Sequence, residues 1–146
     1  MLRPLLAVLL AFAAAHADAA DIGQIKVSKG AVTIERAGQQ VPAAVGTHVQ
    51  ASDVIRTGSD GSVGITMTDD SLLSAGPNSV LALDRYDFDD VTSRGQFDAS
   101  LAKGSLAVVS GRLAKQSPDA MKIRTPSAVL GVRGTEFVVK IGRAHV

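Results

Sequence analysis

Short runs of residues in which apolar side chains recur at every second position fill the chain after residue 20, and each run ends at a Gly, Pro, Asn or Asp. The clearest run places Val63, Ile65 and Met67 on one face. Alternation with a period of two is typical of strands with one buried face, whereas helices need a period of 3.6. The pattern therefore predicts an all-β fold, either a compact β-solenoid-like roll or twisted antiparallel sheets of short strands.

The spacing of these runs also predicts how neighbouring strands connect. Gly30 separates the alternation of residues 25–27 from that of residues 32–34, which favours a hairpin. Residues 62–88 contain three consecutive strands, as an antiparallel meander or as coils of a solenoid. Residues 96–101 and 105–110 form a further pair around Gly104, and one helical turn is expected over residues 111–116. The remaining expected strands cover residues 54–57, 120–125, 128–132 and 135–140.

The first 19 residues have the features of a secretory signal peptide. Arg3 supplies a positive start, Leu5 to Ala15 is an apolar run of 11 residues, and Ala17 and Ala19 provide the small residues that a signal peptidase requires. A membrane-spanning helix needs about 20 residues. We expect cleavage after Ala19, with Ala20 as the alternative, and a periplasmic mature chain without a membrane span.

The last six residues, 141–146, correspond to the translation of a common sequencing adapter. We interpret them as a non-native tail and leave them out of the fold prediction. The alternative is an ordinary polar tail. Residues 20–140 then form one β domain, since this length suits a single core and no linker-like tract interrupts it.

Composition excludes several classes of function. The chain has 15 Lys and Arg and 14 Asp and Glu, and removal of residues 1–19 takes away one of each kind, so the mature domain is close to neutral. A near-neutral chain with few aromatic residues is not typical of nucleic-acid binders. The chain has no Cys, so it forms no disulfide and no thiolate metal site, and we expect no cofactor.

Four segments in order resemble the FecR domain family. They are Asp53–Gly58 followed by Gly61-Ser62, then Asp69–Leu73, then Lys103–Leu106, and finally Thr125–Phe137, and together they extend the resemblance from about Gly30 to Val139. It implies an extracytoplasmic, β-rich domain of the sort that relays surface signals in iron uptake. The structural motif residues that it marks are Asp53, Gly58, Gly61, Asp70, Ser71, Gly104, Gly131, Gly134 and Thr135.

The departures from this family pattern matter as well. The resemblance to family members that regulate sigma factors implies a cytoplasmic segment, then a transmembrane helix and then this domain. Here we expect a cleavable signal peptide to precede the domain instead. The resemblance therefore fits a freestanding periplasmic FecR-like protein better than a transmembrane regulator. Locally, Ala51-Ser52 precedes Asp53 where the family usually has a Gly beside the Asp.

Catalytic and metal sites find little support in the sequence. His48 is the only histidine between the signal peptide and the tail, and no nucleophile elbow or zinc-protease motif is present. We therefore expect no enzyme and interpret His48 as an exposed loop residue, with a hydrolase as the alternative. Asp84–Asp90 suggests calcium, but alternation places Asp84, Tyr86 and Phe88 on one face and Arg85, Asp87 and Asp89 on the other. We expect no metal there.

Arg133 and Glu136 are the candidate binding residues, because they lie beside glycines in a segment that predicts a tight turn. Arg133 either contacts a ligand or forms an ion pair with a buried carboxylate such as Asp53 or Asp69; the second alternative is favoured. The sequence thus predicts a non-catalytic binding or signal-sensing module for an envelope protein, a polysaccharide or peptidoglycan. The alternative is a structural subunit of an envelope assembly.

Overall fold

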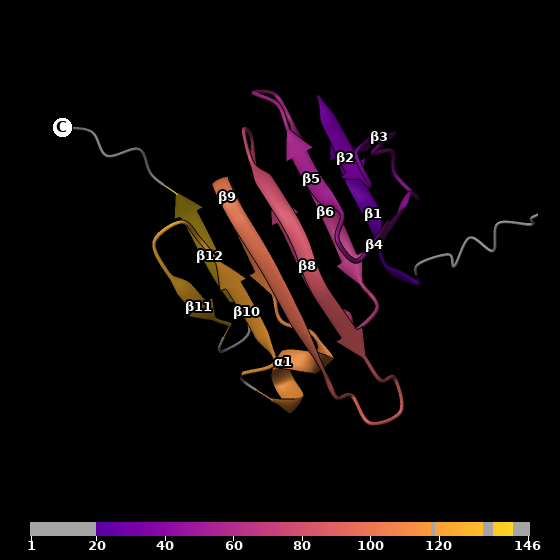
Figure 1. Ribbon diagram of the computed structural model, residues 1–146, viewed down its shortest axis with the longest axis vertical. Helices are drawn as coiled ribbons and strands as arrows, with labels where there is room; N and C mark the ends of the chain where they lie inside the picture. The colour runs from indigo at the N-terminus through magenta and orange to yellow at the C-terminus, as the bar shows by residue number, and fades with distance from the viewer. Residues whose placement is uncertain (1–19, 118, 133–135, 142–146) are drawn as a thin grey trace, which may run out of the picture.

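The computed structural model describes residues 20–117, 119–132 and 136–141, and it confirms the all-β prediction (Figure 1). Most strands pair antiparallel, and the connected strands curl so that two layers face each other. In chain order the elements are β1 (Asp21–Lys29), β2 (Val32–Arg36), β3 (Gln39–Pro42), β4 (His48–Gln50), β5 (Val54–Thr57), β6 (Ser62–Met67), β7 (Leu72–Ala75), β8 (Val80–Phe88), β9 (Gly95–Val109), α1 (Arg112–Gln116), β10 (Met121–Arg124), β11 (Val129–Gly131) and β12 (Glu136–Ile141).

We call the two layers sheet A and sheet B. Sheet A has the order β12-β9-β7-β6-β1-β4, and sheet B has the order β3-β2-β5-β8-β9-β10-β11. Only the pairing of β10 with β9 is parallel among the described strands. Strand β9 belongs to both sheets, so hydrogen-bonded strand pairing continues from one sheet into the other.

The prediction of two strands around Gly104 was wrong, because residues 95–109 form the single strand β9. Its first part pairs with β8 and β10, and its last part pairs with β7 and β12. Gly104 lies at the change of sheet with φ +90°, and a Cβ there would collide with the Ser79 hydroxyl. The glycine therefore bends the strand without ending it.

The predicted hairpin around Gly30 was also wrong. Strand β1 pairs with β4 and β6 in sheet A, whereas β2 pairs with β3 and β5 in sheet B. Gly30, with φ +64°, lies at a corner between the sheets where the turn of residues 58–61 packs against it: Ala31 N–H donates to Asp60 Oδ1 at 3.2 Å, and Gly58 N–H donates to Ala31 O at 2.9 Å. A glycine between two alternating runs marks a hairpin and a corner equally well.

The meander predicted for residues 62–88 is only partly correct. Strands β6 and β7 do form an antiparallel hairpin, but β8 crosses to sheet B after the turn at Gly76–Ser79. In that turn, Thr57 Oγ1 donates to Gly76 O at 2.6 Å and accepts from Ser79 N–H at 2.8 Å. The side chain of Thr57 thus joins the two sheets at this crossing.

The core lies between the sheets and is formed by the inward-facing half of each alternating run. Helix α1, the single predicted turn, covers one end of this core with Leu113 and Ala114. Among the described residues, no helix is long and apolar enough to cross a membrane. The largest fully buried side chains are Phe97, Ile25, Ile34, Ile55, Ile65, Met67, Leu73, Leu81, Leu83, Leu101, Leu106 and Leu113.

Candidate functional site

The outer faces of the two sheets differ in charge. On sheet B, charged side chains lie along the strands in opposite-sign pairs: Arg56 Nε donates to Glu35 Oε2 at 3.0 Å, and Arg85 Nε donates to Asp87 Oδ2 at 2.9 Å. Lys122 of β10 is in register with Asp98 of β9 on the same face. This alternation of charges is typical of a solvated sheet face.

The outer face of sheet A has an uncharged centre. One row of outward-facing positions crosses five neighbouring strands in register, from β12 through β9, β7 and β6 to β1. The side chains of this row are small or aliphatic, and none is charged. The row consists of Val138, Ala107, Ser74, Gly64 and Val27.

Leu72 and Val109, which are opposite each other on β7 and β9, extend this row to one side. We call these two residues and the row together the neutral face. Val27 and Leu72 are each 44% exposed and Val138 is 63% exposed, so three of the chain's exposed large aliphatic residues lie on one surface. Exposed aliphatic side chains that gather on one uncharged sheet face make that face a candidate interaction surface.

Gly64 keeps the neutral face flat. Its position is in register with Val27, and a Cβ added at Gly64 would lie 3.2 Å from the Cβ of Val27. The Val27 side chain therefore lies across the glycine, in the space that another residue would fill. Flat surfaces of small residues allow a partner to approach the sheet closely.

Charged residues flank the neutral face along its edges. Lys140 and Lys29 occupy the next row, in register with Ser105 and Ser62, and Glu136 lies opposite Val109. Neither lysine takes part in an ion pair with another described residue. A neutral centre with a polar border is the usual anatomy of a protein interface.

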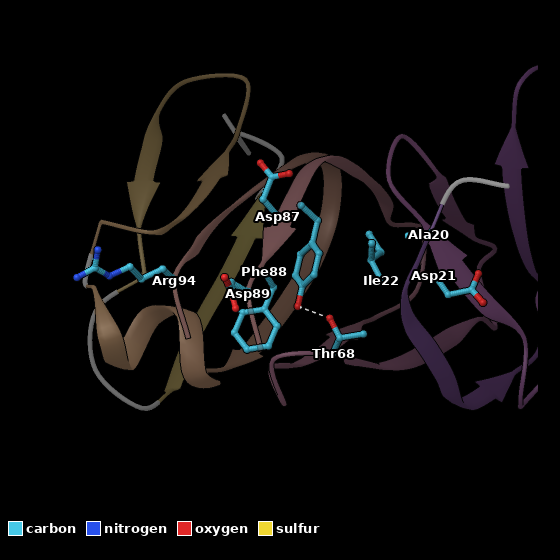
Figure 2. A pocket seen from close by; sticks show the side chains of 9 residues that line it. Ala20, Asp21, Ile22, Thr68, Asp87, Phe88, Asp89 and Arg94 are labelled. Atoms are coloured by element: carbon cyan, nitrogen blue, oxygen red, sulfur yellow. Dashed lines mark hydrogen bonds between the residues drawn. The ribbon is translucent and has the colours of Figure 1, made fainter. Parts of the chain in front are cut away.

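A shallow hollow of about 450 Å³ lies at one end of the two sheets (Figure 2). Figure 2 shows Ile22 and Asp21 on one side of it and Phe88, Asp89 and Arg94 on the other. Three carboxylates and one guanidinium make its lining acidic. The lining residues are Ala20, Asp21, Ile22, Thr68, Tyr86, Asp87, Phe88, Asp89 and Arg94.

Tyr86 is one of the residues that line this hollow, and a polar network holds it in place. Its hydroxyl is 2.8 Å from Thr68 Oγ1, accepts from Asp69 N–H at 2.9 Å and lies 3.2 Å from Asp69 Oδ1. Its ring meets Phe97 edge-on, with the centroids 5.1 Å apart. Burial, with a contribution from the charge of Asp69, raises the pKa of Tyr86 above its usual range. The phenol is therefore a neutral structural group rather than a base.

The predicted motif residue Ser71 belongs to the same network. Its hydroxyl donates to Asp69 Oδ2 at 2.7 Å and accepts from Gly111 N–H at 3.1 Å, while Leu113 N–H donates to Asp69 Oδ2 at 3.2 Å. The Asp69 carboxylate thus fixes the start of α1 against the β6–β7 turn. Asp70 forms the turn itself with φ +69° and is exposed. These motif residues stabilise the fold.

Asp53 is fully buried and pairs with Arg36, a residue that the sequence analysis did not select. Arg36 donates to both carboxylate oxygens, at 2.9 and 2.8 Å, and Gln50 N–H donates to Oδ2 at 2.8 Å. The hydrogen bond to this carboxylate raises the pKa of Arg36. Arg36, the last residue of β2, precedes Asp53 by 17 positions in the sequence. The contact between them therefore becomes visible only once the strand pairing is known.

Arg133, Gly134 and Thr135 lie outside the described residues. The two carboxylates expected for Arg133 have other partners among the described residues: Arg36 and Gln50 bind Asp53, whereas Tyr86, Ser71 and Leu113 bind Asp69. Glu136 is the exposed first residue of β12 and flanks the neutral face.

Gly58 and Gly61 of the predicted motif allow close packing against residue 31. Neither of them has a positive φ. A Cβ at Gly61 would collide with Ala31 O, and one at Gly58 would lie 3.0 Å from the Ala31 Cβ. Gly131, at the end of β11, has open space where a Cβ would point.

His48 and the acidic residues 84–90, which the sequence analysis considered for catalysis and metal binding, lie apart from one another. His48 is an exposed residue at the start of β4, with Asp21 Oδ2 3.7 Å from its Nδ1. No three potential metal ligands cluster within the part of the chain that the structure describes.

The alternation predicted for residues 84–89 was wrong at Asp84. A bulge in β8 turns the Asp84 side chain outward, where it accepts a hydrogen bond from Ser100. Tyr86 is buried, as alternation from Phe88 requires.

Comparison with known proteins identifies one relationship. The model of a family described as FecR protein matches residues 53–146, which is more than half of the chain and begins at the buried Asp53. No curated protein and no solved structure matches the chain.

Proposed function

Because the chain belongs to the FecR family, we propose that it is an exported, non-catalytic binding or signal-sensing module of the cell envelope. The family is associated with the envelope and with signalling. The signal-peptide features of residues 1–19 support export to the periplasm.

The neutral face is the observation that carries the binding role. It is uncharged over five neighbouring strands and exposes aliphatic side chains on three of them, β12, β7 and β1, whereas the opposite sheet carries paired charges. The partner that fits it is an envelope protein with an uncharged, flat centre. Carboxylates at the border of that partner would complement Lys29.

Two alanines of β9 provide a matched test. Ala107 lies within the neutral face, whereas Ala102 is exposed five positions earlier, in the part of β9 before the bend. Replacing Ala107 by Glu places a charge in the centre of the interface, and we expect partner capture from an envelope fraction to fall about tenfold or more. Ala102→Glu should leave capture unchanged, and both variants should keep the wild-type circular dichroism spectrum. Equal capture by the two variants contradicts the proposal.

Treatment of the envelope fraction separates the classes of partner. Protease treatment before the capture should abolish binding if the partner is a protein. Loss of binding after digestion with a muramidase, with no effect of protease, would instead identify peptidoglycan and contradict the proposed protein partner.

A structural subunit of an envelope assembly is the second candidate, and the edge strands β12 and β4 of sheet A favour it, since an open sheet edge can add further strands. The stoichiometry of the captured complex distinguishes the two. A sensing module binds reversibly and exchanges with added free protein, whereas a scaffold subunit co-purifies at a fixed ratio and does not exchange.

A further inference from the structure

Strand β12 is the last strand of sheet A, and its outer edge has no partner among the described residues. Figure 1 shows β12 beside β9, on the side away from β8. In an antiparallel pair, half of the backbone N–H and C=O groups of a strand point away from its partner. The outer edge of β12 therefore presents hydrogen-bonding groups to a further strand.

The outward side chains of β12 are Glu136, Val138 and Lys140, in that order. The sequence is self-complementary about Val138. If a second copy of β12 lies antiparallel with its Val138 opposite the first Val138, each Glu136 faces the Lys140 of the other strand. Opposite charges and an apolar pair directly across an antiparallel ladder both stabilise it.

The inward side chains of β12 support the same register. Phe137 is only half-buried at this edge of the core, whereas Val139, two positions later, is 7% exposed. The register about Val138 places each Phe137 opposite the Val139 of the second copy. Association would therefore cover apolar surface that the single chain leaves open.

We propose that the protein forms a two-fold symmetric homodimer in which two β12 strands pair antiparallel about Val138, with Glu136 of each copy opposite Lys140 of the other. Sheet A then continues from one copy into the other through about four to six main-chain hydrogen bonds. The neutral faces of the two copies form one surface across the two-fold axis. This inference rests on β12 and does not depend on the proposed partner.

Sedimentation velocity of the purified protein over a concentration series tests the dimer. A single strand pairing is a small interface, so we expect a dissociation constant of about micromolar order. Glu136→Lys places lysines opposite each other at both ends of the pairing, and Lys140→Glu does the same with glutamates. Each variant alone should associate at least about tenfold more weakly than the wild type.

Mixing the two variants provides the decisive measurement. In the mixture, the Glu136→Lys chain carries lysine at both positions and the Lys140→Glu chain carries glutamate at both, so a heterodimer again pairs opposite charges and should form with about the wild-type affinity. Because both positions are exposed, a circular dichroism spectrum serves to confirm that each variant is folded. A wild-type protein that remains monomeric at several hundred micromolar overturns the proposal. Association that persists in either variant alone, or that mixing fails to restore, also overturns it.

Discussion

Ser52 has a backbone conformation that glycine adopts without strain. Its φ is +72°, it is exposed, and its N–H donates to Leu83 O at 2.7 Å, which holds the turn before the buried Asp53. The left-handed region costs a residue with a Cβ about 1–2 kcal/mol. This is the position where the sequence departs from the pattern that the resemblance to the FecR family implies, and the positive φ suits the glycine of that pattern.

Ser52→Gly should therefore stabilise the fold. We expect the free energy of unfolding to rise by about 0.5–1 kcal/mol, since the relief of strain exceeds the greater entropy of glycine in the unfolded chain. Urea denaturation measures the change. Ser59→Gly is the control, because Ser59 is also exposed but has no positive φ; it should be neutral or destabilising. A destabilised Ser52→Gly protein would contradict this account of the turn.

The resemblance to the FecR family, and not the local alternation, selected Asp53, Ser71 and Gly104. Each of these residues has a specific contact in the structure. Arg36 was not predictable in the same way, because its partner depends on which strands pair. Gly58 and Gly61 show a third case, in which residues that the resemblance marks have close packing around them and no positive φ.

At the scale of elements, β9 determines the architecture. Fifteen residues continue as one strand from sheet B into sheet A, and Gly104 provides the bend with φ +90°. A side chain at this position would collide with the Ser79 hydroxyl, which lies in the turn where β8 enters sheet B and accepts from Ser105 N–H at 3.0 Å. The bend of β9 at Gly104 is thus packed against the turn that leads from β7 in sheet A to β8 in sheet B.

Gly104→Ala should be strongly destabilising. The strain of positive φ and the steric collision together should lower the free energy of unfolding by about 2–5 kcal/mol. Gly131→Ala is the matched control, since a Cβ at Gly131 has open space and its φ is not positive, and its effect should stay within about 0.5 kcal/mol. Chemical denaturation of both variants measures the difference. Similar stabilities for the two would show that the bend at Gly104 tolerates a side chain.

The positions of strands followed from alternation, but their partners did not. The strands at residues 62–67 and 80–88 and the helical turn after Gly111 were predicted correctly. The hairpin at Gly30 and the strand pair at Gly104 were wrong, because a glycine at a corner between sheets has the same sequence pattern as one in a hairpin. Alternation also cannot distinguish two half-length strands from one strand that bends.

At the scale of the whole molecule, the two sheets share one core but have different outer surfaces. The outward positions of sheet B carry ion pairs, while those of sheet A carry the neutral face. The neutral face could not be predicted from sequence, because Val138, Leu72 and Val27 come from three separated strands and lie on one surface only through the observed register. Its uncharged surface is the basis of the proposed binding role.

Site-specific photo-cross-linking in intact cells tests this role most directly. A photoreactive phenylalanine analogue at Ser74 lies in the middle of the neutral face, and the same analogue at Ala102 lies outside it; both positions are exposed. We predict a discrete cross-linked product with an envelope protein from position 74 and none from position 102. The same products from both positions, or none from position 74 while the protein is exported and folded, would contradict the neutral face as the binding surface.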